Sequence, residues 1–293
     1  MILSCEYVLE RGRKNPGNDN ASLEDQLVKE ALERRGLRTE IKSWSDKSVV
    51  WENVGAILVR SCWDYVFVFP DFLPWLKQTA ILTPFINSAE LLFWNIDKNY
   101  LKELAGKGVK IVPSIFIEKG EKRSLTHILG STPWKEVVLK PCVSGGARHT
   151  YRFQVAEGGA FEEIFQELIQ EEHMILQPFI PEIISRGEYS FMFFDGEYSF
   201  TTLKQAKQGD YRVQDDFGGT VVMYQPTEEE IQFAKAAVAA CPYLPAYARV
   251  DCIPTDEGLL LSEIELIEPE LWFRFLPAAA ESMADAVLKR LAP

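Results

Sequence analysis

The chain has 293 residues, 47% of them hydrophobic, so it can bury a substantial core and has the length of two or three lobes. Its 31 Lys and Arg residues against 43 Asp and Glu residues give a formal charge of -12 without a basic stripe, which argues against nucleic acid as a partner. No apolar run approaches the ~20 residues that cross a bilayer, so no membrane partner is expected.

The cysteine content and the first residues indicate the compartment. The five cysteines are scattered, lack Cys-x-x-Cys spacing and are accompanied by only three histidines, which argues against a disulfide framework or a zinc site. The opening MILSCEYVLE lacks the basic and long apolar regions of a signal peptide and is more typical of a strand. We therefore expect a cytoplasmic protein.

Residues 1–92 alternate strand and helix patterns and are predicted to form an N-terminal α/β lobe. Ser22, followed three residues later by Asp25, is the expected N-cap of a helix that runs to about Arg35 and ends at Gly36. Strands are expected near residues 39–44 and 55–60.

The second of these strands leads into the loop Arg60-Ser61-Cys62-Trp63-Asp64-Tyr65. In open α/β sheets, the loops at the carboxyl ends of the strands form the binding crevice. Arg60, Asp64 and Tyr65 are therefore candidates for a substrate pocket, because a guanidinium pairs with a carboxylate and an acid can hold an amine. The alternative is that this aromatic loop packs on a neighbouring lobe or serves a homodimer.

Residues 93–176 are predicted to form a central lobe. Asn95 is the expected N-cap of a helix from Ile96 to about Lys107, which stops at Gly108. Further elements are expected as strands near residues 110–117 and 136–140 and as a long amphipathic helix around residues 160–172.

Two lysines and a glycine loop in this lobe are candidates for phosphate binding. Lys98 lies near the start of the first helix, and Lys140 ends an apolar strand shortly before Ser144-Gly145-Gly146. Backbone N–H groups of such a loop can approach polyphosphate oxygens without obstruction by a Cβ atom, and the loop can close as a lid. The alternatives are solvated lysines and an ordinary turn.

A short apolar strand that runs into a proline is a candidate for nucleoside binding. It contains Gln177, and the edge-strand backbone groups of Phe179 and Ile180 could contact a purine. The carboxylate of Glu188 could accept hydrogen bonds from ribose hydroxyls. The alternative is a core strand followed by a surface acid.

Residues 177–293 are predicted to form a C-terminal lobe. Arg212 lies in a loop that contains Gly209 and Gly218, after a strand that carries Lys204, and its guanidinium offers a fixed fork to a transferred phosphoryl group. The alternative is a solvated loop arginine. The first strands of this lobe are expected at residues 189–194 and 197–203, around an Asp195-Gly196 turn.

Near the end of the chain, two apolar strands flank a polar turn at residues 256–257, which predicts a β-hairpin. Asp251 then lies opposite Ser262 or Glu263, and Glu265 shares a face with Glu263, so three carboxylates converge. Like-charge repulsion raises at least one carboxyl pKa in such a cluster, and magnesium ions would relieve it. The alternative is an acidic, solvated face of an edge hairpin.

Taken together, these motifs resemble the ATP-grasp superfamily. The likeness is greatest to small ATP-grasp ligases of the kind that forms D-cycloserine, and also extends to ribosomal-protein glutamate ligases and glutathione synthetases. The motifs are Asn95-x-Asp97-Lys98, Val138-Leu139-Lys140-Pro141, the glycine loop, Gln177-Pro178-Phe179-Ile180, Gly209-Asp210-x-Arg212 and Asp251…Glu263-x-Glu265, with Arg60-x-x-Trp63-Asp64-Tyr65 in the N-terminal lobe.

The resemblance implies an α/β lobe followed by two α+β lobes that grip ATP. It implies an ADP-forming ligase that activates a small carboxylate-like substrate, such as an amino acid, as an acyl phosphate for attack by an amine or similar nucleophile. A cyclo-ligase, a small-molecule kinase and a nucleotide-binding regulatory protein remain alternatives.

The resemblance also implies a role for each matched residue. Lys98 and Lys140 would bind phosphate, Phe179 and Ile180 would contact adenine, and Glu188 would bind ribose. Arg212, with Lys204 and Arg249, would stabilise the reaction intermediate. Two Mg²⁺ ions would be bound by Asp251, Glu263 and Glu265. Many family members end the last motif with Glu-x-Asn, so Glu265 raises the charge of the site, and Glu268 could share the metal role. Pro178 replaces an acidic residue common in other ligases, which leaves the adenine contacts less defined.

Overall fold

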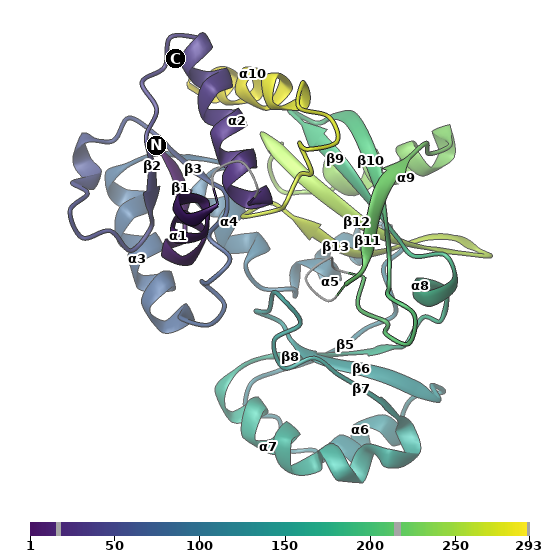
Figure 1. Cartoon of the computed structure of the whole chain (residues 1–293). Helices are drawn as coiled ribbons and strands as arrows, with labels where there is room; N and C mark the ends of the chain where they lie inside the picture. The colour runs from purple at the N-terminus through teal and green to yellow at the C-terminus, as the bar shows by residue number, and fades with distance from the viewer. Residues whose placement is uncertain (16–18, 214–217, 292–293) are drawn as a thin grey trace.

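The structure is a computed structural model that describes residues 1–15, 19–213 and 218–291. Its described residues contain three β-sheets (Figure 1). The first is parallel, with the order β2-β1-β3-β4, and so confirms the α/β class expected for the N-terminal lobe. Its strands are β1 (Ile2–Ser4), β2 (Ile41–Ser43), β3 (Ile57–Val59) and β4 (Phe85–Ile86).

Helices accompany this parallel sheet. The N-cap of the second helix is Asp19, whose side chain accepts a hydrogen bond from the Ser22 N–H at 2.9 Å, so the prediction of Ser22 as the cap is wrong by three residues. Gly36, with φ of 81°, follows the end of this helix as predicted. The helices are α1 (Glu6–Lys14), α2 (Asn20–Arg34), α3 (Phe69–Leu82) and α4 (Ala89–Asn95), with the short 3-10 helix η1 (Trp51–Asn53).

The second sheet is antiparallel, with the order β5-β8-β6-β7, and α6 and α7 lie together on one side of it (Figure 1). Because β8 is paired on both sides, the edge strand expected before Phe179 is an interior strand instead. The elements are β5 (Ile115–Ile117), α6 (Leu125–Gly130), β6 (Glu136–Pro141), β7 (Tyr151–Gln154), η2 (Val155–Phe161), α7 (Glu162–Glu171) and β8 (Met174–Pro178).

The third sheet is antiparallel, with the order β11-β10-β9-β12-β13. Asp195 and Gly196 form the β9–β10 turn with φ of 52° and 79°, as the Asp-Gly pair predicts. The elements are α8 (Glu182–Ser185), β9 (Glu188–Phe194), β10 (Glu197–Gln205), β11 (Thr220–Tyr224), α9 (Glu228–Ala239), β12 (Tyr247–Thr255), β13 (Gly258–Glu265) and α10 (Ala279–Leu291).

Asn95 joins the N-terminal half of the chain to this third sheet. It is the last residue of α4 rather than an N-cap, and its buried amide donates to the Ile264 carbonyl and accepts from the Leu266 N–H, both at 2.8 Å. The next helix, α5 (Tyr100–Gly106), contributes Leu104 to the core of the third sheet. The start of the segment assigned from sequence to the central lobe therefore packs with the C-terminal strands.

The last helix returns to the N-terminal lobe, where α10 and α2 lie side by side (Figure 1). Arg35 donates to Asp285 at 2.7 Å, and Val28 and Met283 belong to one buried core. These contacts fix the first and third sheets relative to each other. Within the ranges described above, no helix combines the length and apolarity that a bilayer span requires.

Candidate active site

A cavity of about 530 Å³ is lined by residues that belong to, or lie next to, all three sheets. Most of the residues singled out from the sequence lie on its wall. They are Tyr65, Lys98, Lys140, Ser144, Gly145, Gly146, Gln177, Phe179, Ile180, Glu188, Lys204, Arg212, Arg249, Asp251, Glu263 and Glu265.

The β12–β13 hairpin supplies the acidic wall of this cavity. Asp251 pairs with Glu263 in the ladder, within the register step that the turn position predicts. The next pair is Cys252 with Leu261, so Ser262 is the extra residue of a β-bulge. The Ser262 hydroxyl lies 2.5 Å from the carboxylate of Glu188, which brings the predicted ribose acid to the same wall.

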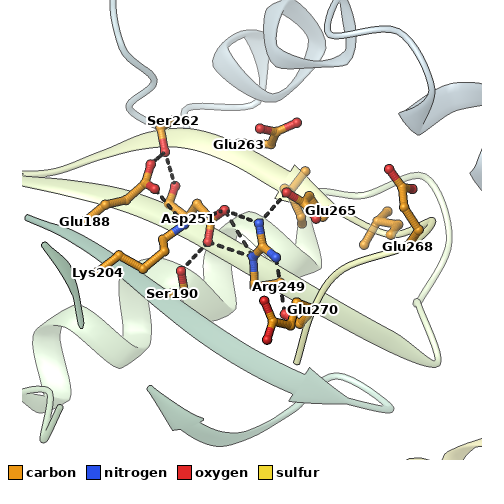
Figure 2. Close-up of polar contacts among 12 residues, drawn as sticks. Glu188, Ser190, Lys204, Arg249, Asp251, Ser262, Glu263, Glu265, Glu268 and Glu270 are labelled. Atoms are coloured by element: carbon orange, nitrogen blue, oxygen red, sulfur yellow. Dashed lines mark hydrogen bonds and ion pairs between the residues drawn. The ribbon is translucent and has the colours of Figure 1, made fainter. Parts of the chain in front are cut away.

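Asp251 is buried on the interior strand β12 and is surrounded by donors (Figure 2). Its carboxylate accepts from Ser190 Oγ at 2.5 Å and from Arg249 Nη2 at 2.8 Å, and lies 3.3 Å from Lys204 Nζ. Burial alone would raise the pKa of Asp251, but the two cations outweigh it and lower the pKa to about 2. Asp251 is therefore ionised at neutral pH.

The other two acids of the predicted metal site each contact a cation. Glu263 Oε1 lies 2.9 Å from Lys98 Nζ. Glu265 pairs with Arg249, as Figure 2 shows. Among the described residues, no three His, Cys, Asp or Glu side chains are close enough together to form a ready metal cage. The structure thus brings Asp251, Glu263 and Glu265 to one wall but pairs each with a cation.

Burial and mutual repulsion oppose the ionisation of two carboxyl groups of this wall. Burial, with added repulsion from Glu263 and Asp251, raises the pKa of Glu265 to about 7 despite Arg249. Burial, with added repulsion from Glu265 and Glu263, raises the pKa of Glu268 well above its usual range. Mg²⁺ prefers oxygen ligands, and a bound cation would relieve the repulsion between these carboxylates, so the residues present fit a magnesium site.

Lys140 faces the cavity from the end of β6. Burial lowers its pKa, and the charge of Lys98 lowers it further. Lys98 itself donates to the Ser144 carbonyl at 2.7 Å, and Lys204 pairs with Glu188 at 2.6 Å. Lys140, in contrast, has no hydrogen-bond or ion-pair partner within the described parts of the chain, and so is available to an anion.

The glycine loop lies between Lys140 and the N-terminal lobe. Gly146 and Ala147 have φ of 56° and 59°, so the loop makes a tight left-handed turn. Arg148 anchors it through two 2.9 Å hydrogen bonds to Glu172. A Cβ atom on Gly145 would stand 3.6 Å from a methyl group of Val66, which shows how closely the loop approaches the aromatic loop.

The proposed nucleoside residues lie at the end of β8. The Phe179 N–H donates to the Glu136 carbonyl at 2.9 Å, so it is already used within the sheet. The Arg152 guanidinium lies 3.6 Å from the centre of the Phe179 ring. Gln177 donates to Ser114 Oγ at 2.9 Å, which fixes its side chain at the cavity wall.

The arginine expected to stabilise the reaction intermediate lies on a loop that reaches the cavity. Arg212 contacts both oxygens of Asp210, with Nη2 at 2.7 Å and Nε at 3.1 Å. These contacts lower the pKa of Asp210. They hold the guanidinium fork in one orientation at the cavity wall.

On the substrate side, the structure corrects two sequence predictions. Arg60 is 2% exposed and pairs with Glu24 at 2.9 Å, and Asp64 accepts from Trp44 Nε1 at 2.8 Å. Neither residue lines the cavity, because buried partners elsewhere in the lobe hold both side chains. Tyr65 does line it, so it is the one member of this trio that reaches the site.

The same loop also packs on the C-terminal part of the chain, which was the alternative interpretation. Trp63 lines the cavity and donates to the Glu268 carbonyl at 2.8 Å. Sequence reasoning missed that Glu270 and Trp272 line the cavity beside Glu268. For Glu270 a signal was present, because it lies two residues after Glu268 and is followed by the fully buried Leu271; no motif marks Trp272.

Comparison with known proteins identifies the family. Residues 2–87 match the family described as the N-terminal domain of D-cycloserine synthetase DcsG. The chain is 30% identical over 286 residues to the cycloserine biosynthesis protein DcsG of Streptomyces lavendulae, covering 90% of this chain and 92% of that protein. The chain belongs to the DcsG family.

Solved structures agree with this assignment. The crystal structure of D-cycloserine synthetase DcsG matches this chain with a TM-score of 0.86 and 26% identity, covering 99% of both chains. A D-alanine–D-alanine ligase from Bacillus anthracis matches with a TM-score of 0.65 and 16% identity, covering 99% of this chain and 96% of that one. An ATP-grasp RimK domain protein from Sphaerobacter thermophilus matches with a TM-score of 0.65 and 14% identity, covering 90% and 94%.

The last two likenesses establish the fold, and all three confirm the ATP-grasp architecture expected from the sequence motifs. The chain is accordingly an ATP-grasp enzyme, an ADP-forming ligase of the DcsG family. Enzymes of this kind couple the conversion of ATP to ADP to bond formation through an acyl phosphate. ATP with Mg²⁺ is the general cofactor requirement of the fold.

Proposed function

We propose that the cavity binds Mg–ATP and a small carboxylate-like substrate, such as an amino acid, and forms an acyl phosphate that an amine or similar nucleophile attacks. The observation that carries this proposal is Lys140. Lys140 is largely buried at the end of β6, and its ammonium has no partner among the described residues, although Lys98 and Lys204 beside the cavity are both paired. A buried cation is costly unless an anion accompanies it, and a polyphosphate supplies that anion.

The acids of the opposite wall would hold the metal. We assign Asp251, Glu263 and Glu265 as Mg²⁺ ligands, with Glu268 as a fourth carboxylate within the same wall. Because one Mg²⁺ ion usually takes only one or two protein carboxylates, this number of acids supports two ions. Bound Mg²⁺ would neutralise negative charge on the phosphate oxygens.

The remaining cations of the site act on the phosphoryl group. Lys204 and Arg249 are fixed by their contacts with Asp251, and Arg212 is oriented by Asp210. Positive groups that are held in place before the reaction stabilise developing charge without reorganisation, so we assign all three to stabilisation of the transferred phosphoryl group.

The nucleoside and the substrate occupy opposite ends of the cavity in this proposal. Gln177, Phe179, Ile180 and Glu188 bind the adenine and ribose, and Ser144, Gly145 and Gly146 cover the phosphates. Tyr65 borders the substrate end. The five cysteines are buried and unpaired, which suits a reducing compartment, so we place the activity in the cytoplasm.

A screen for ADP release over amino acids and related carboxylates, with mass detection of products, tests this function. The proposal predicts substrate-dependent ADP release that requires Mg²⁺ and yields a product joined through the former carboxylate. Binding of ATP without ADP release across the screen would instead favour the regulatory protein that the sequence left open.

Ring closure within one substrate is the second candidate, since the relatives at 30% and 26% identity are named for cycloserine synthesis. A cyclo-ligase yields a product from one organic substrate with no added nucleophile. A small-molecule kinase yields a stable phosphoester that keeps the phosphate. Product masses separate these outcomes from an intermolecular ligase.

A further inference from the structure

A short strap after β13, residues 268–274, connects the N-terminal lobe to the proposed catalytic cations. Trp63 donates to the Glu268 carbonyl at 2.8 Å, and Arg249 Nη1 donates to the Glu270 carbonyl at 3.2 Å. The strap also carries Trp272 into the wall of the cavity. It therefore contacts both the N-terminal lobe and the cluster around Asp251.

Trp272 adopts an unusual backbone conformation within this strap. Its φ is 47°, in the left-handed region that bulky side chains rarely occupy. Such a conformation persists only where the surrounding contacts impose it. The side chain is 3% exposed, and its Nε1 has no hydrogen-bond partner in the described chain.

Glu24 of α2 supplies the contacts that impose this conformation. Its carboxylate accepts hydrogen bonds from the N–H groups on either side of Trp272, those of Leu271 at 3.0 Å and Phe273 at 3.0 Å. Arg60 Nη2 also donates to this carboxylate, at 2.9 Å. The backbone before and after Trp272 is thus clasped by a buried acid from a distant helix.

The indole that this clasp fixes lies against two of the proposed phosphoryl-binding cations. The centre of the Trp272 ring is 5.0 Å from the Arg249 guanidinium and 5.6 Å from Lys204 Nζ. An aromatic face attracts a cation without adding negative charge, so it restrains both groups without adding a further acid to those that already pair with them. A carboxylate in the same place would pair with them and weaken their hold on phosphate.

We propose that Trp272 is a positioning residue of the ligase reaction, held by Glu24 so that its indole fixes Arg249 and Lys204 against the reacting phosphoryl group. Because this inference rests on the proposed roles of those two cations, its test needs one readout that depends on turnover and one that does not.

The turnover readout compares Trp272→Leu with Trp272→Phe, which keeps an aromatic face. Trp75→Leu is the matched control, because Trp75 is also packed among aromatic rings with an unpartnered Nε1 but lies outside the cavity. We expect Trp272→Leu to lower kcat by about 10- to 100-fold with KM for ATP changed less than about threefold. Trp272→Phe should retain most of the activity, and Trp75→Leu should lower Tm without lowering kcat.

The clasp is tested in the same way with Glu24→Gln, against Asp25→Asn, which alters the adjacent buried acid of α2 without touching the strap. Glu24→Gln should lower kcat by about tenfold, and Asp25→Asn should not. A folded Trp272→Leu enzyme with kcat within about twofold of the original, or equal losses in Trp75→Leu, would overturn the proposal.

The independent readout is the NMR signal of the Arg249 Nε–H group, assigned by its loss in Arg249→Lys. Ring currents of the indole act on this proton, so its chemical shift should change in Trp272→Leu and Glu24→Gln. It should not change in the controls Trp75→Leu and Asp25→Asn. If the unmodified enzyme released no ADP with any substrate, the proposed function would be wrong. The NMR signal would still show whether Glu24 and Trp272 position Arg249, because it does not depend on turnover. An unmoved signal in Trp272→Leu would refute the clasp itself.

Discussion

Lys98 and Glu263 form an ion pair at 2.9 Å across the cavity wall. Lys98 precedes α5 and is the proposed phosphate ligand, and Glu263 on β13 is the proposed metal ligand. Burial alone would lower the pKa of Lys98, but Glu263 and its acidic neighbours raise it, so the ammonium stays charged. Substitution of the acid therefore affects the metal site and the phosphate site together.

We predict that Asp251→Asn and Glu263→Gln each reduce ADP formation by at least about 100-fold, because each removes a charged oxygen ligand while leaving the side-chain size unchanged. Steady-state ADP release over a range of Mg²⁺ concentrations measures this loss. Glu257→Gln, in the exposed turn of the same hairpin, should behave like the original enzyme. Near-normal turnover in either site variant would contradict the metal assignment.

The departure from the Glu-x-Asn motif gives a second prediction. Glu265→Asn removes a partly buried acid whose pKa is raised to about 7 and which pairs with Arg249. An amide oxygen can still bind Mg²⁺, so turnover should persist, with an apparent Mg²⁺ affinity weakened by about 3- to 10-fold. A complete loss of ADP formation at saturating Mg²⁺ would show that the second acid has a role that an amide cannot replace.

The hairpin shows why part of the site was predictable. The position of its turn and the two-residue period of a strand, both local properties of the sequence, place Asp251 opposite Ser262 or Glu263, and the β-bulge in the structure selects Glu263. Asn95 and Arg60 were misassigned for the opposite reason. The carbonyl partner of Asn95 lies at Ile264 and the acid that holds Arg60 lies at Glu24, so only the tertiary fold reveals either contact.

Lys140→Met should weaken Mg–ATP binding by about 10- to 100-fold, since it removes a cavity ammonium that has no partner in the part of the chain that the structure describes. Isothermal titration calorimetry measures the loss. Lys102→Met, which changes an exposed lysine on α5, is the matched control and should bind normally. Burial lowers the pKa of Lys140, so its ammonium loses its proton at a lower pH than the ammonium of an exposed lysine. As the pH rises, the affinity of the original enzyme for Mg–ATP should therefore begin to fall at that lower pH.

If Lys140→Met bound Mg–ATP as tightly as the original chain, the anion site would have to lie elsewhere. The assignment of the cavity as the nucleotide site would then lose its main support.

A fourth prediction concerns stability rather than turnover. Burial raises the pKa of Asp25 from 3.8 to about 6, so the folded chain holds this proton more tightly than the unfolded chain. The contribution of Asp25 to the free energy of unfolding should therefore fall by about 2 kcal/mol between about pH 4 and pH 7. Urea unfolding of the original chain and of Asp25→Asn, compared at both pH values, isolates this difference.

Because Asn is neutral at every pH, the difference between the two proteins reports Asp25 alone. A difference that stays constant from pH 4 to pH 7 would show that Asp25 is not the buried titrating group.

The strap after β13 shows what the sequence did not reveal. Trp272 follows a predicted strand without any motif, and its left-handed backbone depends on Glu24, which lies on α2 far away in the chain. The three-lobe ATP-grasp fold was recognisable because its motifs are short and ordered along the chain. The packing of α5 on the third sheet was not, because it depends on contacts between remote segments.

The most direct test of the account is hydroxylamine trapping during ADP formation with an accepted carboxylate. Hydroxylamine attacks acyl phosphates, so we predict a hydroxamate of the substrate in an amount matching the ADP released, dependent on Mg²⁺ and absent in Asp251→Asn. ADP formation with a stable phosphoester of the substrate and no hydroxamate would contradict activation of a carboxylate in this cavity.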